Sequence, residues 1–208
     1  MTSSYNNITG TDSANTLIGS TGADSFSASS GDDIVLGGGT NDIVDLGAGN
    51  DSVNFTTDLS GAAIYGKGGN DSLGITVSVN TSTLSGGAGN DTLWVTKGVN
   101  AYLTGDLGSD TISFLGTDFN NSTVYGGNLS DATSSDGADS IYISGTASAS
   151  YIAGNGGNDT MRLVAAVTGG SSVVGGQGGD DLSLEGSVTG SVVSGNLGND
   201  TMKLDEVI

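Results

Sequence analysis

The sequence contains no cysteine and no histidine, and only four of its 208 residues are basic. Without cysteine the chain cannot form disulfides, thiolate zinc sites or cysteine nucleophiles, and without histidine it has no imidazole base, imidazole metal ligand or Ser-His-Asp triad. Most hydrolase chemistry is therefore excluded, and we expect that the protein is not an enzyme. The net charge of −19 also argues against binding to nucleic acid, anionic lipid or phosphate.

Long apolar runs are missing as well. No stretch approaches the roughly 18 apolar residues that a membrane span requires, so we expect no membrane insertion. The first ten residues, MTSSYNNITG, have neither a basic region nor an apolar region, and they do not resemble a cleavable secretory signal.

What the chain has in quantity is glycine and aspartate. It contains 38 Gly, and all of its 23 acidic residues except Glu185 and Glu206 are Asp. Such a composition usually predicts disorder, because it offers little apolar area to offset the loss of chain entropy. Only a regular repeat could overturn that expectation. The excess of short carboxylates indicates that the natural partner is a cation.

A repeat is present, and the aspartates mark it. Segments of nine residues begin at Gly10, and their sixth residues are Asn15, Asp24, Asp33, Asp42 and Asp51. After Asp51 the motif Asp recurs in steps of 19 to 21 residues, with one step of 29, at Asp71, Asp91, Asp110, Asp139, Asp159, Asp180 and Asp200. Every second nonapeptide of the first part gives nearly the same period.

Apolar residues follow the same period. From Asp51 onward the chain carries apolar residues two and four positions after each motif Asp, such as Leu73 and Ile75, and this alternation predicts a strand with one buried face. A second column just before the glycines, Ile64, Leu84, Leu103, Val124, Ile152, Val174 and Val193, marks an opposing strand, with small residues such as Ser172 two places earlier. A third column, Leu59, Val79, Val99, Val167 and Val188, lies at a polar bend.

The fold predicted from these columns is an all-β, parallel β-solenoid of about ten coils of 18–21 residues, each with two facing strands. The whole chain, 1–208, is expected to form one solenoid, with tandem nonapeptides over 10–54 and coils of about 20 residues over 55–204. A set of antiparallel hairpins is the alternative, because Gly-rich turns also favour hairpins. Hairpins would not require the same acid at every turn.

The turns resemble those of a known family. GAGND (47–51), GGAGND (86–91), GNGGND (154–159), GGQGGD (175–180) and GNLGND (195–200) are similar to the calcium-binding nonapeptide of the repeats-in-toxin (RTX) family. The resemblance implies a β-roll in which glycines turn carbonyl oxygens toward an ion, Asp supplies a carboxylate, and each Ca²⁺ lies between successive coils. The sequence departs from the family pattern after Asp51, where only one edge of the roll keeps the motif. Calcium turns are therefore expected mainly along one edge.

The resemblance thus implies one long column of metal ligands and a short second column. The long column comprises Asn15, Asp33, Asp51, Asp71, Asp91, Asp110, Asp139, Asp159, Asp180 and Asp200, and the short one runs from Asp24 to Asp42. Up to about ten Ca²⁺ ions are expected, enough to neutralise the charge of the chain. The step from Asp110 to Asp139 contains an excursion from Asn128 to Asp136, expected to be a surface loop, and that site is expected to be the first to lack an ion.

The favoured function is that of a secreted, calcium-dependent structural protein that assembles with copies of itself into a surface layer, filament or matrix. Solenoids without capping elements expose strand edges, and these stack. An outward set of Tyr102, Tyr151, Val173, Val192, Trp94 and Tyr142 could provide lateral contacts. An extracellular or cell-surface location in a Gram-negative-type bacterium is expected, with type I export suggested by the acidic and apolar end LDEVI.

Two alternatives remain. The chain could be the C-terminal calcium-folding and secretion module of a larger RTX enzyme, toxin or adhesin. Ice binding is less favoured, because ice-binding calcium solenoids place Thr in the turn where this chain has residues such as Ala48, Gly68 and Leu107.

Overall fold

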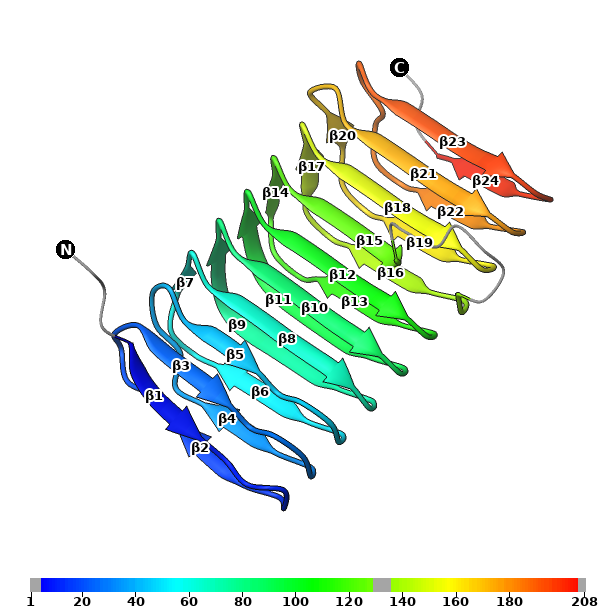
Figure 1. Cartoon of the computed structure of the whole chain (residues 1–208). Coiled ribbons are helices and arrows are strands. Elements are labelled where there is room, and N and C mark those ends of the chain that lie inside the picture. Colours follow the sequence, from blue (N-terminus) through cyan, green and yellow to red (C-terminus); the bar gives the residue numbers. More distant parts are fainter. Residues whose placement is uncertain (1–4, 129–135, 206–208) are drawn as a thin grey trace.

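The computed structural model describes residues 5–128 and 136–205, and over these it is an elongated parallel β-solenoid (Figure 1). Every strand pairing between the described elements is parallel. Paired residues are 18 to 29 positions apart in the sequence, which matches the spacing of the motif residues from coil to coil. The predicted fold class is confirmed, and the hairpin alternative is wrong. No helix in the described part of the chain is long and apolar enough to cross a membrane.

One sheet of ten strands forms the first long face. In order along the sheet it contains β1 (Asn6–Thr9), β3 (Asp24–Ser27), β5 (Ile43–Asp45), β8 (Ala63–Gly68), β10 (Thr83–Ala88), β12 (Tyr102–Leu107), β15 (Thr123–Gly127), β18 (Tyr151–Gly156), β21 (Ser172–Gln177) and β23 (Val192–Leu197).

Each strand on the main path of the second sheet begins directly after a motif residue. Its main path contains β2 (Thr16–Ile18), β4 (Ile34–Leu36), β6 (Ser52–Phe55), β9 (Ser72–Asn80), β11 (Thr92–Val99), β13 (Thr111–Phe114), β16 (Ser140–Ile143), β19 (Thr160–Leu163), β22 (Asp181–Leu184) and β24 (Thr201–Leu204). Each coil thus contributes one strand to each long face, as the two apolar columns predict.

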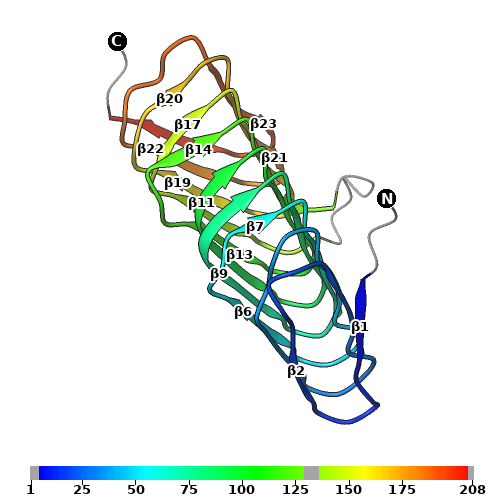
Figure 2. The ribbon, with the colours of Figure 1, turned by 90° about the vertical axis from the view of Figure 1, so that its left-hand side faces the viewer.

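A third, shorter face replaces the polar bends expected from the sequence. It is formed by β7 (Leu59–Ser60), β14 (Asp118–Asn120), β17 (Thr146–Ser148), β20 (Val167–Thr168) and the second halves of β9 and β11. Figure 2 shows β7, β11, β14, β17 and β20 following one another along this side. Leu59, Val79 and Val167 of the third apolar column are buried here, Val188 packs against them partly buried, and Phe119 and Ala147 continue the column in the two coils where the sequence showed no match. The assignment of Val99 to this column is wrong. The register shifts by one residue between Val95 and Lys97, so Gly98 lies opposite Val79 and Phe119, and Val99 is half-buried.

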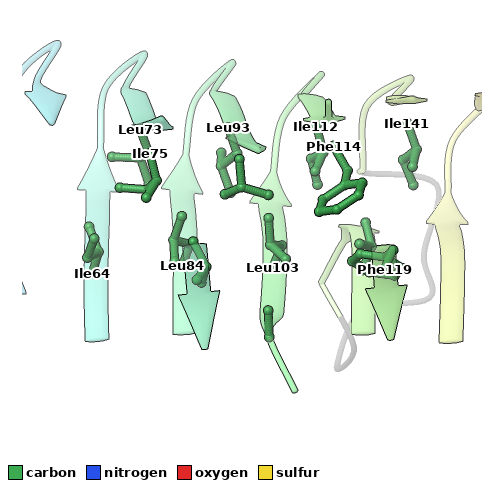
Figure 3. Close-up of a cluster of buried hydrophobic side chains, with 14 of the residues drawn as sticks. Ile64, Leu73, Ile75, Leu84, Leu93, Leu103, Ile112, Phe114, Phe119 and Ile141 are labelled. Carbon is green, nitrogen blue, oxygen red and sulfur yellow. The ribbon is translucent and has the colours of Figure 1, made fainter. Parts of the chain in front are cut away.

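The core fills the space between the faces. Leu73, Leu84, Leu93 and Leu103 point inward from successive coils (Figure 3), and none of them is more than 1% exposed. At about 25 cal/mol per Å² of buried apolar area, these repeated columns provide the main favourable contribution to folding that the polypeptide makes by itself.

One part of the predicted register is wrong. Val173, expected to face outward, is fully buried, and Val174, expected in the core, is half-buried on the outer face. Ser171 rather than Ser172 is buried beneath the neighbouring turn. The strand register Ile152↔Val173↔Val193 explains the difference, because the step from Asp159 to Asp180 has one residue more than 20. On the outer face, Tyr125 packs between Tyr102 and Tyr151, with ring centroids 5.7 Å and 5.6 Å apart.

Candidate metal column

The motif residues line up along one edge because each immediately precedes a strand of the second sheet. The strands are in register, Ser72 opposite Thr92 for example, so their preceding aspartates lie one above the other. From Asp33 to Asp180 every motif Asp of this column is at most 2% exposed. Asn15 and Asp200, the first and last members, are half-buried. The sequence-predicted long column is therefore assembled, and its carboxylates are out of water.

One oxygen of each carboxylate is held by the neighbouring coil. The backbone N–H of each motif residue donates to Oδ1 of the next motif Asp, from Asn15 to Asp33 at 2.6 Å through Asp91 to Asp110 at 2.6 Å to Asp180 and Asp200 at 3.1 Å. The ladder continues across the 29-residue step, where the N–H of Asp110 reaches Asp139 at 2.7 Å. These bonds fix the orientation of the carboxylates, and the inserted segment does not interrupt them.

The other oxygen has no partner. Oδ2 is buried and makes no hydrogen bond in eight consecutive members of the column, Asp33, Asp51, Asp71, Asp91, Asp110, Asp139, Asp159 and Asp180. A buried carboxylate oxygen without a partner is costly, and such groups in folded proteins are normally paired or bound to a metal. The regular recurrence of this atom indicates a ligand position that a cation fills.

From Asp71 to Asp180, a glycine places carbonyl oxygens beside these atoms. This glycine lies five residues before the motif Asp, except that Gly126 takes the position at Asp139. Ala28 and Leu46 hold it before Asp33 and Asp51. A Cβ built on Gly86 would lie 2.3 Å from Asp91 Oδ2 and 2.7 Å from the carbonyl oxygen of Gly105 in the next coil. The same arrangement recurs at Gly105, with Asp110 Oδ2 at 2.2 Å and the Gly126 carbonyl oxygen at 2.4 Å. Carboxylate and carbonyl oxygens of two coils therefore converge on one small space, and hard oxygen ligands of this kind suit Ca²⁺. Among the described residues no three carboxylates cluster, so these carbonyl groups are needed to complete a site.

Burial makes the ionised form of the column unfavourable. Desolvation raises the pKa of Asp51, Asp71 and Asp91 from 3.8 to about 6, and the backbone N–H bonds oppose this only in part. The same cause raises the pKa of Asp110 and Asp159 to about 7 and that of Asp139 to about 8, with neighbouring carboxylates adding to the rise. A bound cation would reverse this effect, because it stabilises the charged form.

The residues of the predicted short column are also brought together, on the opposite edge. Asp24 and Asp42 are fully buried, and the N–H of Asp24 donates to Asp42 Oδ1 at 2.8 Å. Here, however, Oδ2 has a donor within its own turn: the N–H of Ser20 lies 2.6 Å from Asp24 Oδ2, and that of Gly39 lies 2.6 Å from Asp42 Oδ2. The two edges thus differ at the oxygen that faces a potential ion.

Two features of the edge were missed from sequence. The residues just before the motif Asp form a second, exposed ladder, in which the N–H of Asn70 and Asn90 donate to the side-chain oxygens of Asn50 and Asn70 at 2.8 Å and 2.7 Å. The recurrence of Asn before the motif Asp, in the repeated sequence GND, could have indicated this second ladder. Asp136 is the second feature: only 7% exposed, it has an unpartnered Oδ2 and accepts the N–H of Gly137 at Oδ1. The predicted surface loop that precedes it lies, over 129–135, outside the described residues.

The geometry defines a class of protein, a parallel β-roll whose coils present a column of carboxylate and glycine carbonyl oxygens to metal ions. The RTX calcium-binding nonapeptide repeat matches the chain in four copies, at residues 9–44, 18–53, 82–112 and 133–163. These copies cover just over half of the sequence, and the chain belongs to the RTX calcium-binding repeat family. No curated protein and no solved structure matches the chain.

Family membership establishes calcium as the ion of the repeats, so the protein is a calcium-binding β-roll. A roll of this kind is a structural, calcium-binding motif that is not catalytic by itself. The oxygen column continues beyond the matched segments, since Asp71 and Asp180 have the same buried, unpartnered Oδ2 as Asp91 and Asp159. Calcium ligation by the individual motif residues, and the number of ions, remain predictions.

Replacement of Gly86, which faces the column, is expected to destabilise the roll. In Gly86→Ala the new methyl group would collide with Asp91 Oδ2 and the Gly105 carbonyl oxygen, so we expect destabilisation of about 1–3 kcal/mol. In a chain of this size that corresponds to a decrease in melting temperature of about 5 °C in calcium. Gly22→Ala is the matched control, because a Cβ there meets only Ser20 Oγ at 3.7 Å. Equal melting temperatures for the two variants would contradict the assignment.

Proposed function

We propose that the protein is a secreted structural subunit that folds in extracellular calcium and assembles end to end with copies of itself. The observation that supports this most directly lies in the last described coil. Met202 and Leu204 are 52% and 41% exposed, whereas Leu182 and Leu184, their register partners one coil earlier, are fully buried. Apolar side chains at core positions favour burial against a further coil.

The strand edges at this end support the same proposal. Within the described residues β23 and β24 each pair on one side only, with β21 and β22, and β1 and β2 at the other end pair only with β3 and β4. Such edges present rows of backbone donors and acceptors that can pair with another chain. An end-to-end contact joins two different surfaces, so it does not close and it propagates into a filament or sheet.

The metal column adds a specific contact at that junction. In the ladder each motif N–H donates to the next side chain along the column, and Asp200 is the last described member. Asn15 of a second copy lies at the corresponding position in the first coil, where its Oδ1 also accepts the N–H of Thr11. Its backbone N–H already follows the ladder to Asp33. A junction of this kind would continue the register of the column from one subunit into the next.

Assembly is expected to depend on the exposed core positions of the last coil. Met202→Lys should leave the folded monomer almost unchanged, because the side chain is half exposed, but it should block assembly by placing a charge in the junction. Leu115→Lys is the control, since Leu115 is 54% exposed and directly follows β13, in the middle of the solenoid and away from both ends. Sedimentation velocity and negative-stain microscopy in millimolar calcium would measure assembly.

Two results would contradict the structural-subunit proposal. One is a monomeric parent protein at high concentration in millimolar calcium, and the other is assembly of Met202→Lys as readily as the Leu115→Lys control. In either case the calcium-folding and secretion module of a larger protein becomes the better account. That alternative is favoured by the regular oxygen column itself, which any calcium-dependent folding module requires.

An extracellular location is part of the proposal. Sites built for extracellular modules bind calcium at about 10⁻⁴–10⁻³ M, a concentration that the cytosol does not provide. RTX repeats are also typical of secreted proteins of Gram-negative bacteria. The predicted export signal at the end of the chain falls largely on residues 206–208, which lie outside the described residues.

A further inference from the structure

We infer that calcium occupies one edge of the roll only, from Asp33 to Asp200, and that the turns of Asp24, Asp42 and Asn15 are closed by backbone N–H groups in place of ions. This inference rests on calcium binding by the repeats and departs from the short second column expected from sequence. It depends on three observations at the second edge and the first coil.

The first observation is that the second-edge carboxylates have no free oxygen. Asp24 accepts from Asn6 Nδ2 at Oδ1, 3.1 Å, and from the N–H of Ser20 at Oδ2, 2.6 Å. Asp42 accepts from the N–H of Asp24 at Oδ1 and from the N–H of Gly39 at Oδ2, 2.6 Å. On the long column, by contrast, Oδ1 is bonded in the same way while Oδ2 has no partner.

These N–H groups and a calcium ion would compete for the same oxygen. A hydrogen bond to a charged carboxylate is stronger than one between neutral groups, and an ion at Oδ2 would displace the N–H from this acceptor. The donor also carries positive charge at the place where the cation would lie, so the carboxylate is already satisfied. The Ser20 hydroxyl, 3.0 Å from Asp24 Oδ2, adds a further donor in that turn.

The second observation concerns space. A Cβ built on Gly19 would lie 2.5 Å from Cζ of the Phe26 ring, in addition to 2.4 Å from the Gly37 carbonyl oxygen and 2.9 Å from Asp24 Oδ2. On the long column the nearest atoms to the corresponding point on Gly86 belong only to Asp91 and the Gly105 carbonyl group. The Phe26 ring thus occupies part of the space beside Asp24 Oδ2, whereas at Gly86 no ring is among the nearest atoms.

The third observation is that Asn15 follows the second-edge pattern although it lies on the first edge. The N–H of Thr11 donates to Asn15 Oδ1 at 2.5 Å, in the same way as that of Ser20 donates to Asp24. The amide is also neutral, so it adds no charge with which to hold a cation. The calcium column therefore begins at Asp33.

These observations give a number of ions. Eight motif carboxylates, from Asp33 to Asp180, have a buried Oδ2 without a partner, and from Asp71 to Asp180 this atom lies beside a carbonyl oxygen of the next coil. The space between Asp110 and Asp139 is counted as an ion site, because the N–H of Asp110 still donates to Asp139 across the insertion and both residues have an unpartnered Oδ2. We therefore expect eight Ca²⁺ ions per chain, where the motif count alone suggests about ten.

The experiment is a measurement of bound calcium per folded full-length chain, by native mass spectrometry and by calorimetric titration, for the parent, Asp42→Asn and Asp91→Asn. We expect eight ions for the parent, eight for Asp42→Asn, and six or seven for Asp91→Asn, whose carboxylate lies between two gaps. Asp24→Asn replaces Asp42→Asn if the latter does not fold, and circular dichroism verifies folding in each case. The dilute, monomeric protein is used, so the result does not depend on assembly.

Ten ions on the parent chain, or the same loss of ions in Asp42→Asn as in Asp91→Asn, would overturn the inference. If neither second-edge variant folds, the parent count alone still separates eight ions from ten. A count of eight on a chain that never assembles would support the single calcium edge while contradicting the structural-subunit proposal.

Discussion

Removal of calcium at pH 7.5 is expected to unfold the solenoid. Excess chelator should eliminate the β-sheet signal in circular dichroism and change the fluorescence of Trp94, the single tryptophan, which is half-buried against Gly74. Adding calcium back should restore both signals, with a midpoint at about 10⁻⁴–10⁻³ M. Magnesium is the control, since it requires a smaller octahedral site and keeps much of its water.

The physical reason lies in the buried carboxylates. Eight consecutive motif aspartates have an unpartnered oxygen out of contact with water, and in the absence of an ion each pays the full cost of desolvation. Neighbouring carboxylates add repulsion, as between Asp110 and Asp139. Because the site does not exist in the unfolded chain, the free energy of binding becomes free energy of folding. An unchanged β-sheet signal in excess chelator would contradict this account.

Much of the fold follows from the period of the sequence. The recurrence of Asp with apolar residues two and four places later predicts parallel coils, since residues one period apart must stack for the columns to be buried. Leu73, Leu93 and Ile112 lie where this argument puts them. The third face was less predictable. Its strands are only two or three residues long at β7, β14, β17 and β20, too short for an alternating pattern to be recognised.

Local register was harder to predict than the period. Val173 and Val174 are adjacent apolar residues, so either could face the core, and a single extra residue in that coil decides between them. Alignment of columns by their distance from the glycines would have chosen Val173. The sequence-based choice of Val174, which directly precedes Gly175, was wrong.

The difference between the two edges could not be predicted from the motif. Asp24 and Asp33 occupy the same position of consecutive nonapeptides, and the letters around them are similar. What distinguishes them is whether a backbone N–H of the same turn points at Oδ2, as that of Ser20 does at Asp24. That direction depends on the path of the whole turn, and it becomes visible only with coordinates.

The metal-free protein is expected to gain stability on acidification. Asp51, Asp71 and Asp91 have a folded-state pKa of about 6, and that of Asp139 is about 8, against 3.8 for an ordinary Asp. Between pH 4 and pH 8 the folded state therefore binds more protons than the unfolded state, and its stability falls as the pH rises. In chelator, the β-sheet signal should be strongest near pH 4 and absent at pH 7.5, the opposite of the dependence expected with calcium.

A single substitution tests the sign of this effect. Asp139→Asn removes the carboxylate with the highest pKa, and its amide can still accept the N–H of Asp110 while its NH₂ group faces the Gly154 carbonyl oxygen. We expect the variant to be more stable than the parent in chelator at pH 7.5, because no buried charge remains there, and less stable in calcium, because a ligand is lost. Thermal melts in the two buffers measure both. If the melting temperature of the variant is below that of the parent in both, or if the metal-free parent becomes more stable from pH 4 to pH 8, then burial of these carboxylates is not what makes folding depend on calcium.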